Sequence, residues 1–239
     1  MSLILSSRLQ TIADMTPACD TFTDVGCDHG YIPIWLLLNN RCKKAIASDI
    51  GQGPLDTARK NARACGIDCG RISFIISDGL EGITTPDSGN NVLSVTGMGG
   101  LLIADILNKG YEKLSCFSSL ILSPHTKQEE LRRYLIANGF IIKDERYVKD
   151  SDKLYVVIHA MPCKDAKKGY VTEEYNGKDY RFGLFINEAL KNEAVRAYFI
   201  RRYEELCTIL NENKGLPEDR REVLSREVLS YREVLGIEA

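Results

Sequence analysis

The sequence lacks a strong excess of charge of either sign. It has 31 lysines and arginines against 33 aspartates and glutamates, which gives a formal net charge of −2 at pH 7. Nucleic-acid-binding proteins are often strongly basic, and this chain is not. The balance makes such a partner less expected but does not exclude it, because a local basic patch is sufficient.

Long apolar runs are also missing. No uninterrupted run approaches the roughly 20 residues that a membrane-spanning helix needs. The N-terminus meets polar and charged residues almost at once, so we expect no signal peptide. We therefore expect a cytoplasmic protein that does not bind a membrane.

A zinc-binding pattern is absent as well. The eight cysteines are scattered, and only Cys65 and Cys69 lie close together, without a second pair of cysteine or histidine to complete a set of ligands. We expect reduced thiols and no metal.

Short apolar runs alternate with helical patterns from about residue 20 to residue 161. The expected strands are 21–25, 45–48, 72–76, 91–95, 120–122, 140–143 and 154–161, and the expected helices are 4–15, 32–39, 54–65, 101–109 and 128–138. This order predicts an α/β fold with a mainly parallel seven-stranded sheet covered on both faces. The last two strands have no helix between them, so they can form an antiparallel hairpin at one edge.

The pattern changes in the last third of the chain. Residues 164–178 are polar and are typical of a linker. Beyond them apolar residues recur every three or four positions, in two stretches that Gly215-Leu216-Pro217 separates. This spacing predicts an antiparallel helical hairpin of coiled-coil type. We therefore divide the chain into an α/β domain, 1–163, and a helical domain, 164–239.

The end of the first expected strand carries a glycine-rich loop, Asp24-x-Gly26-x-Asp28-x-Gly30. Ligands of open α/β sheets bind outside the carboxyl ends of the strands, and glycines let the backbone turn sharply and approach a ligand closely. The dinucleotide fingerprint Gly-x-Gly-x-x-Gly is missing, which disfavours a pyrophosphate ligand and an NAD-dependent dehydrogenase.

Three later strand ends complete a site of nucleoside shape. Asp49-Ile50 ends the second strand, where a carboxylate can accept both ribose hydroxyls. Asp78-Gly79 follows the third, where an aspartate can accept an adenine amino group, and Gly97-Met98-Gly99 follows the fourth and can line the methionine end and the incoming substrate. Each feature alone is typical of a turn or a helix cap. Their order favours S-adenosylmethionine as the cofactor.

Four motifs resemble the bacterial tRNA adenine-22 N1-methyltransferase family, the TrmK family. They are Asp-Val-Gly-Cys-Asp-His-Gly-Tyr-Ile-Pro (24–33), Ala-Ser-Asp-Ile (47–50), Ser-Asp-Gly-Leu (77–80) and Gly-Met-Gly-Gly (97–100), and the likeness spans roughly residues 4–160. The general methyltransferase pattern has a glycine at the position of Asp28, so the Asp28-His29 pair makes the match family-specific.

The resemblance implies a Rossmann-like methyltransferase domain, a C-terminal coiled-coil domain and methylation of N1 of an adenine in the D-arm of tRNA. One departure is visible. The family commonly has Leu-Gln-Pro-Asn after the fifth strand, whereas this chain has Leu122-Ser-Pro-His125. A histidine can replace the asparagine as a hydrogen-bonding group.

The reaction needs positioning and negative charge more than a base, because adenine N1 attacks as a neutral lone pair and the product is a cation. Asp28 is the first candidate for that charge, and a loop-stabilising carboxylate is the alternative. His29 can hydrogen-bond the base or its own loop. Tyr31 can stack on a base or belong to the core. Arg8 can meet an RNA phosphate or tie the first helix to the loop, and His125 is a candidate substrate contact.

Two other functions stay open. One is methylation of a small molecule or protein, and the other is a nucleotide-binding scaffold without turnover. The absence of an Asn-Pro-Pro-Tyr motif after the fourth strand argues against enzymes that modify amides or exocyclic amines. Acidic residues offset the basic residues of the tail, so an RNA role for the tail rests on the resemblance. We expect a monomer.

Overall fold

The computed structural model describes residues 3–86, 89–163, 177–213 and 215–238. Its centre is a seven-stranded sheet in the order β3-β2-β1-β4-β5-β7-β6. The strands are β1 (Cys19–Val25), β2 (Cys42–Asp49), β3 (Ile72–Ile76), β4 (Asn91–Met98), β5 (Ser119–Pro124), β6 (Phe140–Asp150) and β7 (Lys153–Pro162). The first five run parallel, and β7 is antiparallel to both β5 and β6. The predicted sheet and its edge hairpin are therefore confirmed.

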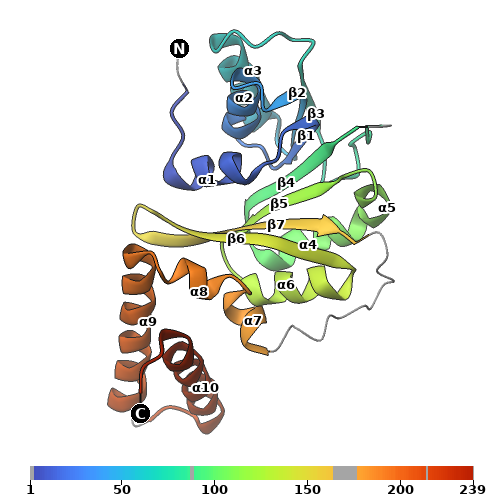
Figure 1. Cartoon of the computed structure of the whole chain (residues 1–239). Helices are drawn as coiled ribbons and strands as arrows, with labels where there is room; N and C mark the ends of the chain where they lie inside the picture. Colours follow the sequence, from blue (N-terminus) through green and yellow to red (C-terminus); the bar gives the residue numbers. More distant parts are fainter. Residues whose placement is uncertain (1–2, 87–88, 164–176, 214, 239) are drawn as a thin grey trace.

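Helices cover both faces of this sheet (Figure 1). On one face, α1 (Ser7–Met15), α2 (Tyr31–Leu38) and α3 (Gln52–Ala64) bury Ile12, Ile34 and Leu55. On the other, α4 (Gly100–Lys109), α5 (Tyr111–Leu114) and α6 (Gln128–Ala137) bury residues such as Ile103 and Leu131. The central strands are thus buried on both sides, as their near-continuous apolar sequences require.

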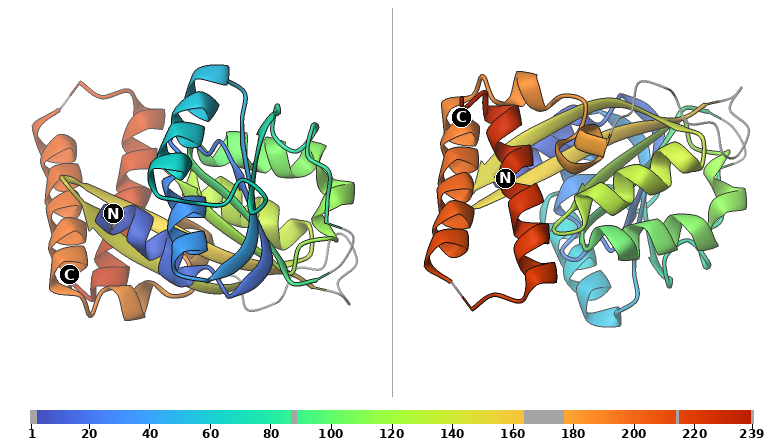
Figure 2. Two further views of the ribbon diagram at one scale, coloured as in Figure 1. Left: turned by 90° about the horizontal axis from the view of Figure 1, so that it is seen from above. Right: turned by 90° about the horizontal axis from the view of Figure 1, so that it is seen from below.

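The C-terminal part contains α7 (Gly177–Phe182), α8 (Ile186–Ala189), α9 (Glu193–Glu212) and α10 (Glu218–Leu235). The guanidinium of Arg196, near the start of α9, donates to the carbonyl oxygen of Leu235, at the end of α10, over 3.3 Å. The two long helices therefore pack antiparallel, as predicted, and Figure 2 shows them side by side. Most of the expected linker, 164–176, lies outside the described residues, whereas 177 and 178 begin α7. The domain boundary at 163 stays a prediction.

A buried ion pair joins α6 to β6. Arg132 Nε donates to Glu145 Oε1 over 2.6 Å, and both side chains are fully buried. The same guanidinium donates to the carbonyl oxygens of Tyr180 and Arg181, over 3.1 and 2.9 Å. The charge of Arg132 is thus satisfied partly by carbonyl groups of α7, and α7 is held against α6.

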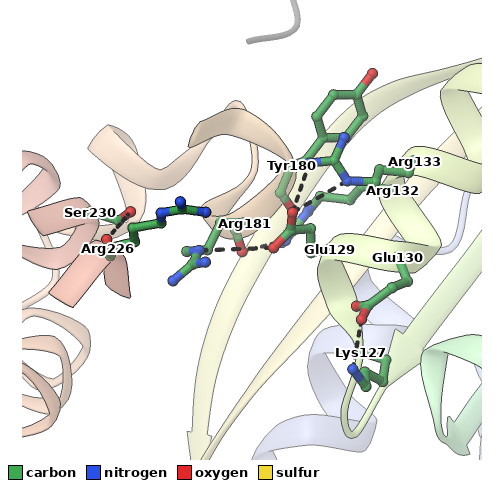
Figure 3. A network of polar contacts seen from close by, with 9 residues as sticks. All are labelled: Lys127, Glu129, Glu130, Arg132, Arg133, Tyr180, Arg181, Arg226 and Ser230. Carbon is green, nitrogen blue, oxygen red and sulfur yellow. Dashed lines mark hydrogen bonds and ion pairs between the residues drawn. The ribbon is translucent and has the colours of Figure 1, made fainter. Parts of the chain in front are cut away.

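Ion pairs on the surface of α6 extend this junction (Figure 3). Glu129 lies 2.8 Å from Arg133 on its own helix and 3.8 Å from Arg181 on α7, and Lys127 pairs with Glu130 over 2.7 Å. Such exposed pairs contribute only about 0–1 kcal/mol each. The buried Arg132–Glu145 pair is therefore the contact to test.

Candidate functional site

A cavity of about 440 Å³ opens at the carboxyl ends of β1, β2, β4 and β5. This is the place where open α/β sheets bind ligands. Its lining consists of Arg8, Leu9, Asp24, Gly26, Cys27, Asp28, His29, Tyr31, Ile32, Asp49, Thr96, Gly97, Met98 and His125. The structure therefore brings together most of the residues that the sequence marks as candidates, from four strand ends and α1.

The loop after β1 depends on backbone conformations that favour glycine. Gly26 and Gly30 have φ of 72° and 71°, and a Cβ on Gly26 would lie 2.1 Å from Met98 Cε. Asp28 also has a left-handed φ, 48°. This explains why the general methyltransferase pattern has a glycine there, because aspartate and asparagine are among the few other residues that tolerate this region. The carboxylate of Asp28 is thus placed at some conformational cost.

Asp24, at the end of β1, is a buried acid with unmet hydrogen-bonding capacity. Its side chain is 2% exposed, and its Oδ1 atom has no hydrogen-bond partner among the described residues. Burial raises the pKa of Asp24, the nearby Ser94 hydroxyl opposes this change and the charge of Asp49 adds to it, so that the pKa lies at about 7. A buried carboxylate of this kind is stabilised by a cationic partner. The Asp24 carboxylate therefore fits a ligand with an ammonium group.

Asp49, at the end of β2, holds two loops together. Its Oδ2 accepts the backbone N–H of Asp28 over 3.3 Å, and its Oδ1 accepts that of Gly51 over 2.9 Å. Each carboxylate oxygen has capacity for a further hydrogen bond. Asp49 is thus oriented by the protein and can still accept hydroxyl groups of a ligand.

Five predicted cofactor or substrate residues do not line this cavity. They are Gly30, Ile50, Asp78, Gly79 and Gly99. Ile50 is 72% exposed, and Asp78 is exposed in the turn after β3. Gly30 has a packing role, because a Cβ there would lie 2.9 Å from Ala58 Cβ. Asp78 and Gly79 nonetheless follow β3, the neighbour of β2, so they lie at the same edge of the sheet.

Asp28, His29 and Tyr31 form the rim of the cavity. The Asp28 and His29 side chains are 69% and 45% exposed, and His29 Nε2 lies 3.6 Å from Asp28 Oδ2. The rings of His29 and Tyr31 are 5.5 Å apart. Tyr31 is 38% exposed, so it is not a core residue. All three side chains are accessible to a large substrate.

Arg8, on α1, and His125, directly after β5, also line the cavity. Arg8 Nη1 and His125 Nε2 are 3.3 Å apart, and the Arg8 guanidinium lies 5.1 Å from the centre of the Tyr155 ring. Burial lowers the pKa of His125, and the charges of Arg8 and Lys153 lower it further. His125 is therefore neutral near pH 7.

Four lining residues were not among the sequence candidates, namely Leu9, Cys27, Ile32 and Thr96. Cys27, Ile32 and Thr96 lie within or directly beside the sequence motifs 24–33 and 97–100. Their place in these motifs is the sequence signal that could have identified them as lining residues. Burial raises the pKa of the Cys27 thiol, and Asp24 and Asp49 raise it further. Cys27 is thus a neutral wall residue and not a nucleophile.

In the described ranges, no three histidine, cysteine, aspartate or glutamate side chains come together as a candidate metal site. None of the helices described has both the length and the apolar character of a membrane span.

Comparison with known proteins agrees with this geometry. A family model described as a methyltransferase domain matches residues 5–158. The tRNA (adenine(22)-N(1))-methyltransferase of Bacillus subtilis is 32% identical over 203 residues, which cover 85% of this chain and 81% of that protein. The chain belongs to the tRNA (adenine(22)-N(1))-methyltransferase family. The resemblance in the sequence motifs is therefore confirmed.

Solved structures of this methyltransferase family share the whole fold. The Streptococcus pneumoniae protein Sp1610, in complex with S-adenosyl-L-methionine, is 30% identical with a TM-score of 0.83, over 97% of this chain and 100% of that one. TrmK of M. capricolum, in complex with S-adenosyl-homocysteine, is 27% identical with a TM-score of 0.81, over 97% and 98%. The coverage includes the C-terminal helices as well as the sheet.

Proposed function

We propose that this protein is an S-adenosylmethionine-dependent enzyme that methylates N1 of the adenine at position 22 of bacterial tRNA. The observation that carries the proposal is the cavity at the carboxyl ends of β1, β2, β4 and β5. Inside it lies the buried carboxylate of Asp24, whose Oδ1 atom has no hydrogen-bond partner among the described residues. Membership of the family supports the choice of cofactor and substrate. We further propose that the enzyme is a cytoplasmic monomer.

Residues at successive strand ends would bind different parts of the cofactor. When bound, S-adenosylmethionine supplies an electrophilic methyl group on a sulfonium. The Asp24 carboxylate accepts from the amino group of the methionine end, and Gly97 and Met98 line that end. Asp49 accepts the ribose hydroxyls, as its fixed orientation allows. Asp78 accepts the adenine amino group, with Ile50 and Gly79 beside the ring.

Asp28 supplies charge where the product needs it. As N1 forms its bond to the methyl carbon, the bond between that carbon and the sulfonium sulfur would break, so the positive charge would pass to the adenine. No proton has to leave before attack. A fixed carboxylate near this cation stabilises the transition state. Asp28 lies at the rim of the cavity, in a loop whose backbone Asp49 holds. His29, beside it, orients the base or the carboxylate.

The substrate has to present an unpaired base, because N1 lies on the Watson–Crick edge. Tyr31 offers an exposed ring at the rim for stacking on such a base. Gly99 adds no side chain beside the cavity, Arg8 is placed to meet an RNA phosphate, and His125 supplies a hydrogen-bond donor to the base.

The test is transfer of radiolabelled methyl groups from S-adenosylmethionine to two tRNA transcripts that differ only in adenine or guanine at position 22. We expect label in the adenine transcript alone, and a large loss of label with Asp28→Ala. Cofactor binding by calorimetry with no transfer to either tRNA would contradict the proposal and favour a scaffold. Equal labelling of both transcripts would indicate another substrate.

A further inference from the structure

A second cavity adjoins the proposed active site. It has a volume of about 440 Å³ and lies between the start of α1 and the turn that joins β6 to β7. Its lining consists of Ser6, Arg8, Leu9, Asp150, Ser151, Asp152, Lys153 and Tyr155. Arg8 and Leu9 line both cavities, so they form the wall between them. A substrate held in the first cavity therefore has the second cavity next to it.

Hydrogen bonds fix the start of α1 on the β6–β7 hairpin, and Figure 2 (left) shows the helix beside it. The carboxylate oxygen Oδ2 of Asp150 accepts the Ser6 hydroxyl over 2.6 Å and the backbone N–H of Arg8 over 3.1 Å. Asp150 is thus engaged by α1 itself. The start of α1, which carries Arg8, is therefore held in place by contacts that do not involve the arginine side chain.

The guanidinium of Arg8 is oriented but keeps donors for a ligand. It lies over the ring of Tyr155 at 5.1 Å, and one of its nitrogens contacts His125 Nε2 at 3.3 Å. Within the described ranges no carboxylate forms an ion pair with it. A guanidinium has five N–H donors in a planar fork, so most of the donors of Arg8 are available.

The chemistry of this wall fits a nucleotide. An arginine fork matches a phosphate group better than any other side chain does. A partly exposed aromatic ring, such as that of Tyr155, can stack on a base of any sequence. Lys153, exposed on the hairpin turn, adds a second cation beside Tyr155. An adenine in the first cavity necessarily has neighbours joined to it through phosphates.

We propose that Arg8, Lys153 and Tyr155 form a subsite for the nucleotide next to the target adenine, in which Arg8 binds the phosphate that joins the two. The proposal rests on the proposed function, because it takes RNA as the substrate. His125 accepts from Arg8 at Nε2 and so fixes the direction of the fork. The nucleotide next to the target then lies in the second cavity against Tyr155.

The experiment compares Arg8→Gln with Arg63→Gln, a matched control on the exposed far end of α3. Binding of unmodified tRNA is measured at several salt concentrations in the presence of S-adenosyl-homocysteine, where no transfer can occur. We expect Arg8→Gln to weaken binding roughly tenfold and to reduce the slope of log K against log salt by about 0.7–0.9, the value for one lost phosphate contact. Arg63→Gln should leave both unchanged.

Methylation kinetics give a second measurement. Arg8→Gln and Tyr155→Leu should raise KM for tRNA roughly tenfold with little change in kcat, and Arg8→Lys should restore part of the loss. Calorimetry with S-adenosylmethionine and thermal unfolding should match the wild type, which excludes a folding defect. Wild-type tRNA affinity and salt slope in Arg8→Gln would overturn the subsite.

The subsite and the proposed function fail in different ways. Suppose that Arg8→Gln binds tRNA tenfold more weakly and with less dependence on salt, while the wild type methylates no tRNA. That result would support the subsite and contradict the proposed function. Methylation of adenine 22 with an unchanged KM in Arg8→Gln would support the function and contradict the subsite.

Discussion

Replacing Asp24, at the end of β1, with asparagine removes the negative charge of this side chain with almost no change in its shape. Burial raises the pKa of this carboxyl from 3.8 to about 7 in the folded protein. The folded state therefore holds the proton more tightly than the unfolded chain does. The resulting contribution to stability is complete below pH 3.8 and is lost progressively as the pH rises through about 7.

The magnitude follows from the size of this shift. The pKa rises by about 3 units, and one unit corresponds to about 1.36 kcal/mol, so ionised Asp24 destabilises the ligand-free protein by up to about 4 kcal/mol at pH 8. We expect Asp24→Asn to be more stable than the wild type at pH 8 by about 2–4 kcal/mol, and the difference to disappear near pH 4.

Urea unfolding at several pH values is the assay, with Asp14→Asn as a control for an exposed acid on α1. The control should follow the wild-type pH dependence. Parallel stability curves for Asp24→Asn and the wild type would refute the reasoning, because they would mean that Asp24 titrates in the same way in both states.

The same acid makes cofactor binding pH-dependent. A cationic ammonium beside Asp24 favours the ionised form and lowers its pKa in the complex. Binding should therefore release a proton below pH 7, and the affinity for S-adenosylmethionine should fall as the pH drops from 8 to 6. Calorimetry in two buffers of different ionisation enthalpy measures both effects. An affinity that stays constant over this range would contradict the role of Asp24.

Substitutions at Asp28, at Glu145 and at two glycines test three other parts of the structure. Asparagine and glycine both tolerate the left-handed backbone at position 28, so Asp28→Asn and Asp28→Gly should bind the cofactor normally. Each should lower the single-turnover rate of methylation at least tenfold. An unchanged rate would mean that Asp28 takes no part in the chemistry. Glu145→Gln leaves Arg132 buried without its counter-ion and should cost about 3–5 kcal/mol in urea unfolding, and a loss below 1 kcal/mol would mean that the pair is not buried in solution. Gly100→Ala places a Cβ 2.2 Å from the Lys127 carbonyl oxygen and should lower Tm, whereas Gly53→Ala on α3 meets nothing and should keep or raise it; equal Tm values would contradict this packing.

The fold could be predicted well where strands are short and apolar. The bounds of β3 agree with the expected range, 72–76. The strand β6 was expected to end at residue 143 but continues to Asp150. Its second half is rich in charged residues, and it pairs with β7 along its length beyond the reach of the other strands. Periodicity of apolar residues does not reveal such a strand, because its side chains are only partly buried.

The site could be predicted as far as it depends on strand ends. Parallel pairing brings Asp24 and Asp49 to one edge, so their order in the chain is enough to place them. Contacts between distant segments were not predictable in this way. Arg8 and His125 are 117 residues apart and meet only because Asp150 anchors α1 on the hairpin. Nor does any local pattern predict that Asp24 is buried with its Oδ1 atom lacking a hydrogen-bond partner among the described residues.

Location of the methyl group is the most direct test of the central claim. Unmodified bacterial tRNA with adenine 22 is incubated with the enzyme and S-adenosylmethionine, cleaved by a base-specific ribonuclease and analysed by mass spectrometry. The account predicts a single 1-methyladenosine at position 22. A methyl group on another atom, such as the exocyclic amine, or at another position in the tRNA would contradict it.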